Sequence, residues 1–215
     1  MCFHIYKLLG NFFIFRLLYK AFSILFRMRF SRIEIKDLLK AWFMVTLAFT
    51  ILFLDSFSFE KAFFLFLVSL FTVGIGFLLH EMMHKFFATR YGCWAEFRAD
   101  SRMLWLMVVM SFFGFIFAAP GGVYIRGRVD VRKNCIISLA GPMTNLVLAL
   151  LFFLLSSLGL TFLHYGSRIN SWLALFNMIP FYGFDGQKVL RWNKAVYTLV
   201  LLASAFFVFF SSTLL

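Results

Sequence analysis

Long apolar runs, separated by short polar or glycine-containing connections, dominate the pattern of the chain. Each run is near the roughly 20 residues that a helix needs to cross a membrane, and none alternates apolar and polar residues as a barrel strand would. The pattern predicts an all-α polytopic membrane protein with about five to six transmembrane helices. The runs cover residues 38–54, 62–79, 103–119, 136–163, 169–181 and 195–215.

One connection has a different period. From Val123 to Val131 apolar residues alternate with polar ones, directly after a Pro-Gly-Gly sequence at 120–122. A turn followed by this alternation is typical of a β-strand. We therefore expect a small membrane-associated β element near residues 120–132.

The N-terminal segment 1–36 is apolar but repeatedly interrupted by basic residues. On a helix Arg16, Lys20 and Arg27 fall on one face, which predicts an amphipathic helix lying on a membrane rich in anionic lipids. A signal peptide is the alternative, but no small-residue cleavage site follows a clean apolar core. We expect this interfacial segment to precede a single domain at 37–215.

Composition excludes several classes of protein. Of the 215 residues, 63% are hydrophobic and 14% are charged, and the mean hydropathy is +0.91. Soluble domains are about 45–50% apolar and about 25% charged. A water-soluble globule could not bury this much apolar surface, so a soluble nucleic-acid binder, a disordered chain and a disulfide-rich secreted module are excluded.

The net charge of +12 has two interpretations. In a soluble protein it would suggest nucleic acid as a partner, whereas in a membrane protein it marks basic cytoplasmic segments beside anionic lipid. Because the composition indicates a membrane protein, we expect no nucleic-acid partner. The odd cysteine count, without CxxC spacing, also argues against a disulfide framework or a thiolate zinc knuckle.

The strongest chemical signal is the sequence His80-Glu-Met-Met-His84 at the end of the second apolar run. Residues four apart lie one above the other on a helix, so the two imidazoles can bind one metal ion. Glu81 projects about 100° away, near the metal without ligating it. The alternative is two hydrogen-bonded histidines at a helix end, but ionisable groups in an apolar helix are functional by default.

A catalytic zinc ion usually has three protein ligands and one open position. Asp185 is the candidate third ligand, because it follows an apolar run that contains no other acid. An Asp-Gly turn in an ordinary loop is the alternative explanation of this residue. Cys93 is a second candidate, although a thiolate beside two histidines is unusual in a hydrolase, and His4 and His164 are poorly placed.

Three motifs in order resemble the site-2 protease family of intramembrane zinc metalloproteases. HExxH at the end of a membrane helix is followed by Asn177-Met-Ile-Pro-Phe-Tyr-Gly-Phe-Asp-Gly186, which matches NxxPxxxxDG. Between them, Ala-Gly-Pro-Met-Thr-Asn145 is similar to the small-residue AGPxxN helix of the family. The resemblance covers residues 62–192 and departs from the family at Met83, where Gly is frequent.

The resemblance implies a role for each matching position. His80, His84 and Asp185 would be the ligands of one Zn²⁺ ion per chain, and Glu81 would be the general base. Asn177 would help to hold the substrate carbonyl or the oxyanion formed from it. The implied activity is hydrolysis of peptide bonds in or near transmembrane segments of a protein or peptide substrate.

The chemistry also follows from the residue types. Zinc lowers the pKa of a bound water from 15.7 toward about 7 and polarises the carbonyl, and Glu81 can carry a proton from that water to the leaving amine. A substrate helix must unwind before it is cut, and an edge strand can hold the unwound segment by main-chain pairing. Gly121, Gly122 and Val123 are the candidate edge, with an ordinary surface hairpin as the alternative.

Two other functions compete with proteolysis. A catalytically silent relative that only binds membrane proteins would not need Glu81. A metal transporter is less favoured, because its sites usually lie at mid-membrane between repeated halves, and no internal repeat is found in the sequence.

The predicted zinc site also constrains the topology. If all the runs crossed, Asp185 and His80 would end on opposite sides of a core about 30 Å thick. A re-entrant or shallow 103–119 segment brings them together and leaves nearly all Lys and Arg on the side of the basic N-terminus. We therefore expect a multi-pass cell-membrane protein with five full crossings, an external C-terminus, and an active site near the cytoplasmic face.

Overall fold

The computed structural model describes residues 28–116, 120–181 and 183–212. The chain divides into compact units at Met1–Ser31 and Arg32–Leu215, and the predicted interfacial helix lies almost wholly outside the described residues. Helix α2 begins before the predicted domain boundary at 36/37. The elements of the second unit are α2 (Arg32–Phe53), α3 (Phe59–Ser69), a π-helical turn (Leu70–Gly74), α4 (Ile75–Arg90), β1 (Trp94–Ala99), α5 (Ser101–Ser111), β2 (Gly121–Arg126), α6 (Val131–Ser157), a 3₁₀ turn (Thr161–Leu163), α7 (His164–Asn177), α8 (Asp185–Trp192) and α9 (Lys194–Ser212).

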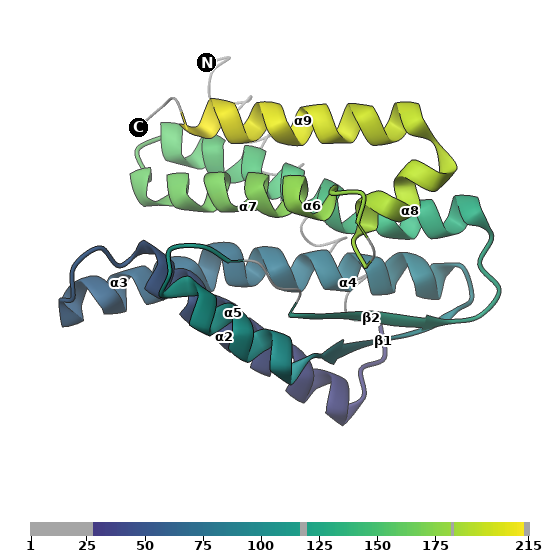
Figure 1. Ribbon diagram of the computed structural model, residues 1–215, viewed down its shortest axis with the longest axis horizontal. Coiled ribbons are helices and arrows are strands. Elements are labelled where there is room, and N and C mark those ends of the chain that lie inside the picture. The colour runs from purple at the N-terminus through teal and green to yellow at the C-terminus, as the bar shows by residue number, and fades with distance from the viewer. Residues whose placement is uncertain (1–27, 117–119, 182, 213–215) are drawn as a thin grey trace, which may run out of the picture. The chain divides into compact units, whose positions relative to one another are not determined.

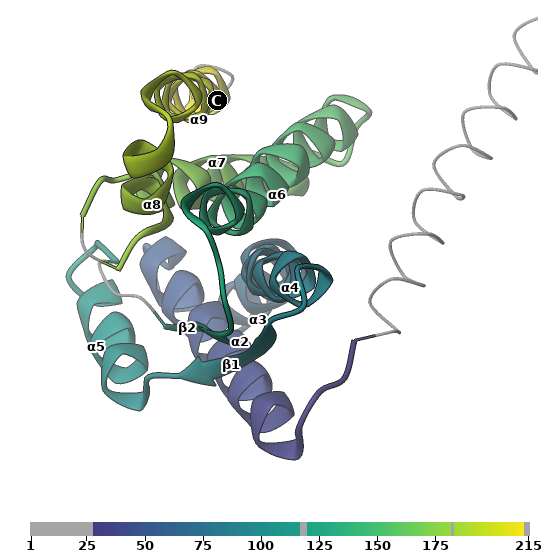
Figure 2. The same ribbon diagram turned by 90° about the vertical axis from the view of Figure 1, so that its right-hand side faces the viewer.

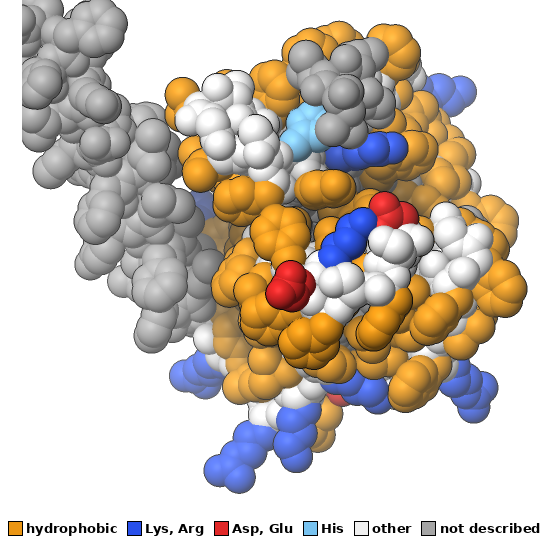
Figure 3. All heavy atoms as spheres, turned by 90° about the vertical axis from the view of Figure 1, so that its left-hand side faces the viewer, with side chains coloured by type: hydrophobic (Ala, Val, Ile, Leu, Met, Phe, Trp, Pro, Cys, Tyr) orange, Lys and Arg blue, Asp and Glu red, His pale blue; other side chains and the backbone are white. Residues whose placement is uncertain are grey.

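Three helices in the described part of the chain are long and apolar enough to cross a membrane. They are Phe59–Arg90, which joins α3, the π-turn and α4, then Val131–Ser157, and Lys194–Ser211 in α9. The predicted helical membrane class agrees with this result, but the count of five to six spans is not confirmed. Figure 3 shows one face of the molecule, where hydrophobic side chains cover most of the described surface and basic side chains gather along one edge.

Helix α6 lies at the centre of the second unit. It packs against α4 on one side and against α7 and α8 on the other, and α9 runs along α7 (Figures 1 and 2). Apolar side chains from α6, α7, α8, α9 and the turn after α7 form a common core. The fully or nearly buried members of this core are Cys135, Leu146, Ala174, Met178, Val189, Tyr197 and Val200.

The π-helical turn interrupts the long helix before the HExxH sequence. A π-turn shifts the hydrogen-bond register, so a main-chain carbonyl becomes available to another partner. Here the Leu70 carbonyl accepts a hydrogen bond from Trp42 Nε1 of α2 at 3.3 Å. A Cβ at Gly74 would collide with the same indole ring and with Thr46. Glycine at this position therefore allows α2 to approach the long helix closely.

A two-stranded antiparallel sheet confirms the predicted β element. Strand β2 pairs with β1 from Trp94↔Arg126 to Ala99↔Gly121. The predicted element extended too far, because α6 already begins at Val131, where the Asp130 carboxylate caps Lys133 N at 2.7 Å. The partner strand β1 was not predicted, since its residues do not alternate cleanly between buried and exposed positions.

The third apolar run begins and ends at the same edge of this sheet. Its two ends are joined by the Ala99↔Gly121 pair and by a hydrogen bond from Asp100 N to the Pro120 carbonyl at 3.1 Å. Between them α5 has 11 residues, which at 1.5 Å per residue is about half of a hydrocarbon core. The run therefore starts and ends beside the same pair of strands.

A buried carboxylate ties the sheet to two helices. Glu34, at the start of α2, is fully buried, and its Oε2 lies 2.5 Å from Lys85 Nζ of α4. Its other oxygen accepts a hydrogen bond from Phe97 N of β1 at 3.0 Å. Both oxygens of the buried charge are thus engaged, and each links a different element to α2.

Breaking this ion pair should destabilise the protein. Glu34→Gln keeps the size of the side chain but removes the negative charge that faces buried Lys85. Loss of one partner from a buried pair costs about 3–5 kcal/mol, and we expect a loss in this range in the free energy of unfolding, measured in detergent micelles.

The matched control is Asp55→Asn, which breaks the exposed Asp55–Lys61 ion pair. We expect this change to have little effect, because exposed pairs are screened by water. Equal unfolding free energies for the two variants would contradict the proposed importance of Glu34.

Candidate active site

Helix α4 presents three polar side chains to one buried space. His80, Glu81 and His84 are each at least nine-tenths buried, although α4 carries mainly apolar residues. The two imidazole rings lie one helical turn apart, with ring centroids 4.6 Å from each other. The helical spacing therefore brings both histidines to one site, as the sequence predicts.

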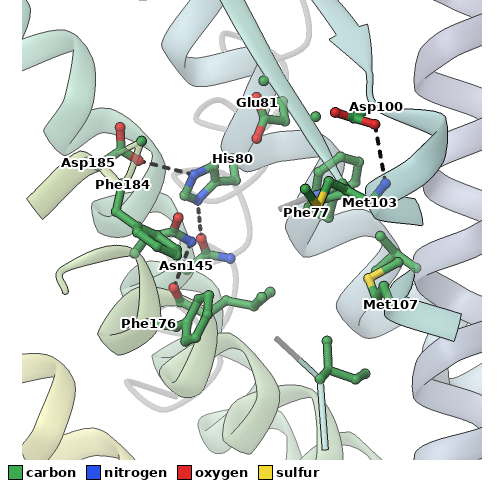
Figure 4. A pocket seen from close by; sticks show the side chains of 18 of the residues that line it. Phe77, His80, Glu81, Asp100, Met103, Met107, Asn145, Phe176, Phe184 and Asp185 are labelled. Atoms are coloured by element: carbon green, nitrogen blue, oxygen red, sulfur yellow. Dashed lines mark hydrogen bonds and ion pairs between the residues drawn. The ribbon is translucent and has the colours of Figure 1, made fainter. Parts of the chain in front are cut away.

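Asp185, the first residue of α8, completes this cluster. Its Oδ2 lies 3.5 Å from His80 Nε2 and 3.1 Å from His84 Nε2, and Figure 4 shows the carboxylate directed at His80. The chain reaches this position by a tight return after α7, because a Cβ at Gly186 would collide with the main chain of Met178. The sequence prediction of Asp185 thus agrees with its position in the structure.

Each histidine uses its other ring nitrogen as an anchor. His80 Nδ1 lies 2.5 Å from Asn145 Oδ1, and His84 Nδ1 lies 2.7 Å from the Ile137 carbonyl. Because a carbonyl oxygen can only accept, each Nδ1 donates and each Nε2 carries its lone pair toward the cluster. This arrangement leaves two imidazole lone pairs and a carboxylate facing one another.

The cluster fits a zinc ion. The possible ligand atoms of His80, His84 and Asp185 all lie within 4.8 Å of one another, and two imidazoles with one carboxylate form a common catalytic zinc set. Gly141 of α6 leaves the space beside them open, since a Cβ there would lie 2.5 Å from Nε2 of both histidines.

The alternative ligands lie elsewhere. Cys93 is buried with Ala88, Ala95 and Ile137 in a separate apolar cluster. His164 Nε2 hydrogen-bonds the Ser211 carbonyl at 2.7 Å. Among the described residues, the metal-binding group contains only the two HExxH histidines and the Asp of the later motif.

The charges around Asp185 favour its ionised form. Burial raises the pKa of Asp185, whereas positive charge at the facing His84 and His80 side of the carboxylate lowers it below its ordinary value. Lys188, one turn along α8, lies 3.6 Å from the second carboxylate oxygen. The carboxylate therefore directs one oxygen at the histidines and the other at an ammonium group.

Glu81 is available for chemistry. Its Oε2 is buried and has no hydrogen-bond partner in the described structure. A buried carboxylate oxygen without a partner is costly unless a ligand or reactant completes it. Glu81 therefore lines the same cavity as the metal-binding cluster with one buried carboxylate oxygen unengaged.

The cluster opens into a large cavity between the sheet and α7. The cavity has a volume of about 1360 Å³ and is lined by His80, Glu81, His84 and Asp185, by many apolar side chains and by several basic ones. Phe77, Met103, Met107 and Phe176 belong to this apolar wall (Figure 4). The site can therefore accept a bulky apolar molecule.

The remaining predicted residues also line this cavity. Asn177 donates one amide hydrogen to the Leu173 carbonyl of its own helix at 2.9 Å, which leaves its second hydrogen available. Gly121, Gly122 and Val123 of β2 contribute to the opposite wall. Their position is compatible with the predicted roles in substrate binding, which stay predictions.

Comparison with known proteins places this site in a family. "Putative zinc metalloprotease MJ0611" of Methanocaldococcus jannaschii is 44% identical over 143 residues, which are 63% of this chain and 75% of that protein. "Zinc metalloprotease MJ0392" of the same organism is 26% identical over 120 residues, which are 53% of this chain and 30% of that protein. No family model matches the chain, and no solved structure matches it significantly. The chain belongs to the zinc metalloprotease family of the first relative.

Zinc binding should weaken when the space beside Gly141 is filled. In Gly141→Ala the new methyl group would press on both ligand nitrogens, and we expect zinc affinity to fall at least about tenfold, as for other disturbances around metal ligands. Competition with a chelator measures this affinity. Met143→Ala, an exposed change on the same helix, is the control and should bind zinc as the wild type does; equal affinities in both variants would contradict the assigned metal position.

Proposed function

We propose that the protein is an intramembrane zinc endopeptidase of the site-2 protease type. The observation that carries the proposal is the buried His80–His84–Asp185 cluster. Its two histidines, and Glu81 between them, belong to a helix that is apolar enough to cross a membrane. The substrate would be a transmembrane protein or peptide cut within or near its membrane segment. The family membership supports the metalloprotease part of this proposal.

The residues divide the reaction between them. His80, His84 and Asp185 would hold one zinc ion, which when bound supplies a Lewis acid for the substrate carbonyl and for water. Glu81 accepts the proton of the attacking water at a carboxylate oxygen and passes it to the leaving amine. The second amide hydrogen of Asn177 is available to the charge that develops on the carbonyl oxygen.

Strand β2 would hold the substrate in an extended form. In the described residues its only strand partner is β1, so its second edge retains unpaired main-chain groups, and Gly121, Gly122 and Val123 lie in the cavity wall. An unwound substrate segment can pair with such an edge. The apolar part of the cavity would receive the neighbouring side chains of the substrate.

The return of the 103–119 segment supports a site near the cytoplasmic face. Since its two ends meet at the sheet, the segment would enter the membrane shallowly and leave on the same side. The basic segments around residues 90–102 and 126–133 then share that side, as the positive-inside rule requires of cytoplasmic segments. We also retain the proposal that the basic N-terminal segment contacts anionic lipids.

Glu81→Gln separates proteolysis from metal binding. The amide keeps the shape of the side chain and all three ligands but cannot accept the proton of water, so cleavage should fall by at least about 100-fold while zinc content stays unchanged. Cleavage of a single-span substrate and metal analysis of the same sample measure both. Glu60→Gln, an exposed change in α3, is the control and should cleave normally.

A proteolytic rate in Glu81→Gln near that of the wild type would remove Glu81 from the mechanism. Zinc binding by a wild-type protein that cleaves no membrane substrate would instead favour a silent binding relative. Zinc transport in vesicles without cleavage would favour the transporter.

The proposed topology places Arg128 on the cytoplasmic side. A cysteine introduced there, in a background without native cysteines, should resist a membrane-impermeant thiol reagent added to intact cells, because the membrane separates the two. Labelling after the cells are opened is the positive control. Ready labelling in intact cells would contradict the topology.

A further inference from the structure

Two fully buried asparagines connect the metal-binding cluster to α7. Asn145 of α6 and Asn170 of α7 have no exposed surface. Asn145 Nδ2 donates to Asn170 Oδ1 at 2.9 Å, and Asn170 Nδ2 donates to the Gly166 carbonyl at 2.9 Å. At the other end of this chain, Asn145 Oδ1 contacts His80 Nδ1. A hydrogen-bonded path thus runs from a main-chain carbonyl of α7 to His80; Figure 4 shows its last contact, between Asn145 and His80.

The Gly166 carbonyl, at one end of this path, fixes the direction of every hydrogen bond along it. The Gly166 carbonyl can only accept, so Asn170 must direct its amide nitrogen at it and its oxygen at Asn145. Asn145 must then direct its own nitrogen at Asn170 and its oxygen at His80. The Gly76 carbonyl lies 3.4 Å from Asn145 Nδ2, a long and weak hydrogen bond beside the 2.9 Å bond to Asn170, so Asn170 is the main acceptor that sets the direction of Asn145.

The consequence falls on the His80 ring. An oxygen at Nδ1 requires a proton there, and the neutral ring then carries its lone pair at Nε2, toward Asp185. If the Asn145 amide were reversed, a donor would face Nδ1 and the neutral ring would carry its proton at Nε2. That tautomer cannot bind a metal through Nε2.

His80 and His84 differ in the acceptor that fixes the proton on Nδ1 of each ring. His84 contacts a main-chain carbonyl directly, and a main-chain carbonyl cannot reverse. His80 contacts an amide side chain that could, so its anchor needs a second residue to hold it. Gly76 of α4 makes room for that residue, because a Cβ there would collide with Asn170 Oδ1.

We propose that Asn170 is a positioning residue of the metal site, which holds the Asn145 amide in the direction that keeps His80 in its metal-binding tautomer. This inference rests on the proposed metal site. Asn170 touches neither metal nor substrate and acts only through Asn145.

The test is the zinc affinity of the purified full-length protein in micelles, measured by competition with a chelator. Asn170→Leu keeps a similar volume but removes the acceptor for Asn145, and we expect a loss of about tenfold, the lower range for partners of metal ligands. The matched control is Ser171→Ala. Ser171 is equally buried on α7, but its hydroxyl donates only to the Ser167 carbonyl of its own helix, so affinity should stay unchanged.

The same substitution in an Asn145→Asp variant distinguishes a positioning role of Asn170 from a packing role. In Asn145→Asp both side-chain oxygens can accept from His80, so the direction of residue 145 no longer matters. Adding Asn170→Leu to this background should not lower zinc affinity, because it only removes an oxygen that faces the second carboxylate oxygen of residue 145, whereas a packing role would give the same loss in both backgrounds. If Asn170→Leu does not fold, Gly76→Ala displaces the Asn170 oxygen instead and should follow the same pattern.

The tautomer itself can be observed in the metal-free protein by ¹⁵N NMR of labelled histidine. We expect His80 to be protonated at Nδ1 in the wild type and to show a mixture of tautomers in Asn170→Leu. Wild-type zinc affinity in Asn170→Leu, or an equal loss in both backgrounds, would overturn the proposal. Failure of the wild type to bind zinc would instead overturn the proposed metal site.

Discussion

The convergence of two imidazole nitrogens and one carboxylate oxygen inside an apolar protein is the constraint on which the rest of the structure depends. Such a buried cluster is costly unless each polar atom has a partner. Asn145 and the Ile137 carbonyl supply partners for His80 and His84, and both belong to α6. The central position of α6 and its close approach to α4 at Gly141 follow from this requirement.

The opposite side of the cavity depends on a different buried charge. Glu34 holds β1 and α4 together through one oxygen each, so the sheet keeps its position beside Glu81. The chain returns between β1 and β2, and Met103 and Met107 of α5 line the cavity. The metal-binding cluster, held from α6, and the sheet, held from α2, both line the large cavity.

The sequence allowed the local part of the site to be predicted, and less of its surroundings. His80, Glu81 and His84 follow from helical spacing alone, and the rarity of acids in the apolar runs identified Asp185. Strand β1 and the asparagine pair could not be predicted from the residue pattern, because their roles depend on partners far away in the chain. Asn170 has no local signal, since its acceptor function exists only when α6 and α7 pack together.

The most direct test is X-ray absorption spectroscopy of the zinc-loaded protein in micelles. The account predicts one zinc ion per chain with only nitrogen and oxygen ligands at about 2.0–2.2 Å, with outer-shell scattering from two imidazoles. In Asp185→Ala one oxygen ligand should be replaced or lost while both imidazoles remain. A sulfur ligand at about 2.3 Å, or a spectrum without two imidazoles, would contradict the proposed His80–His84–Asp185 centre.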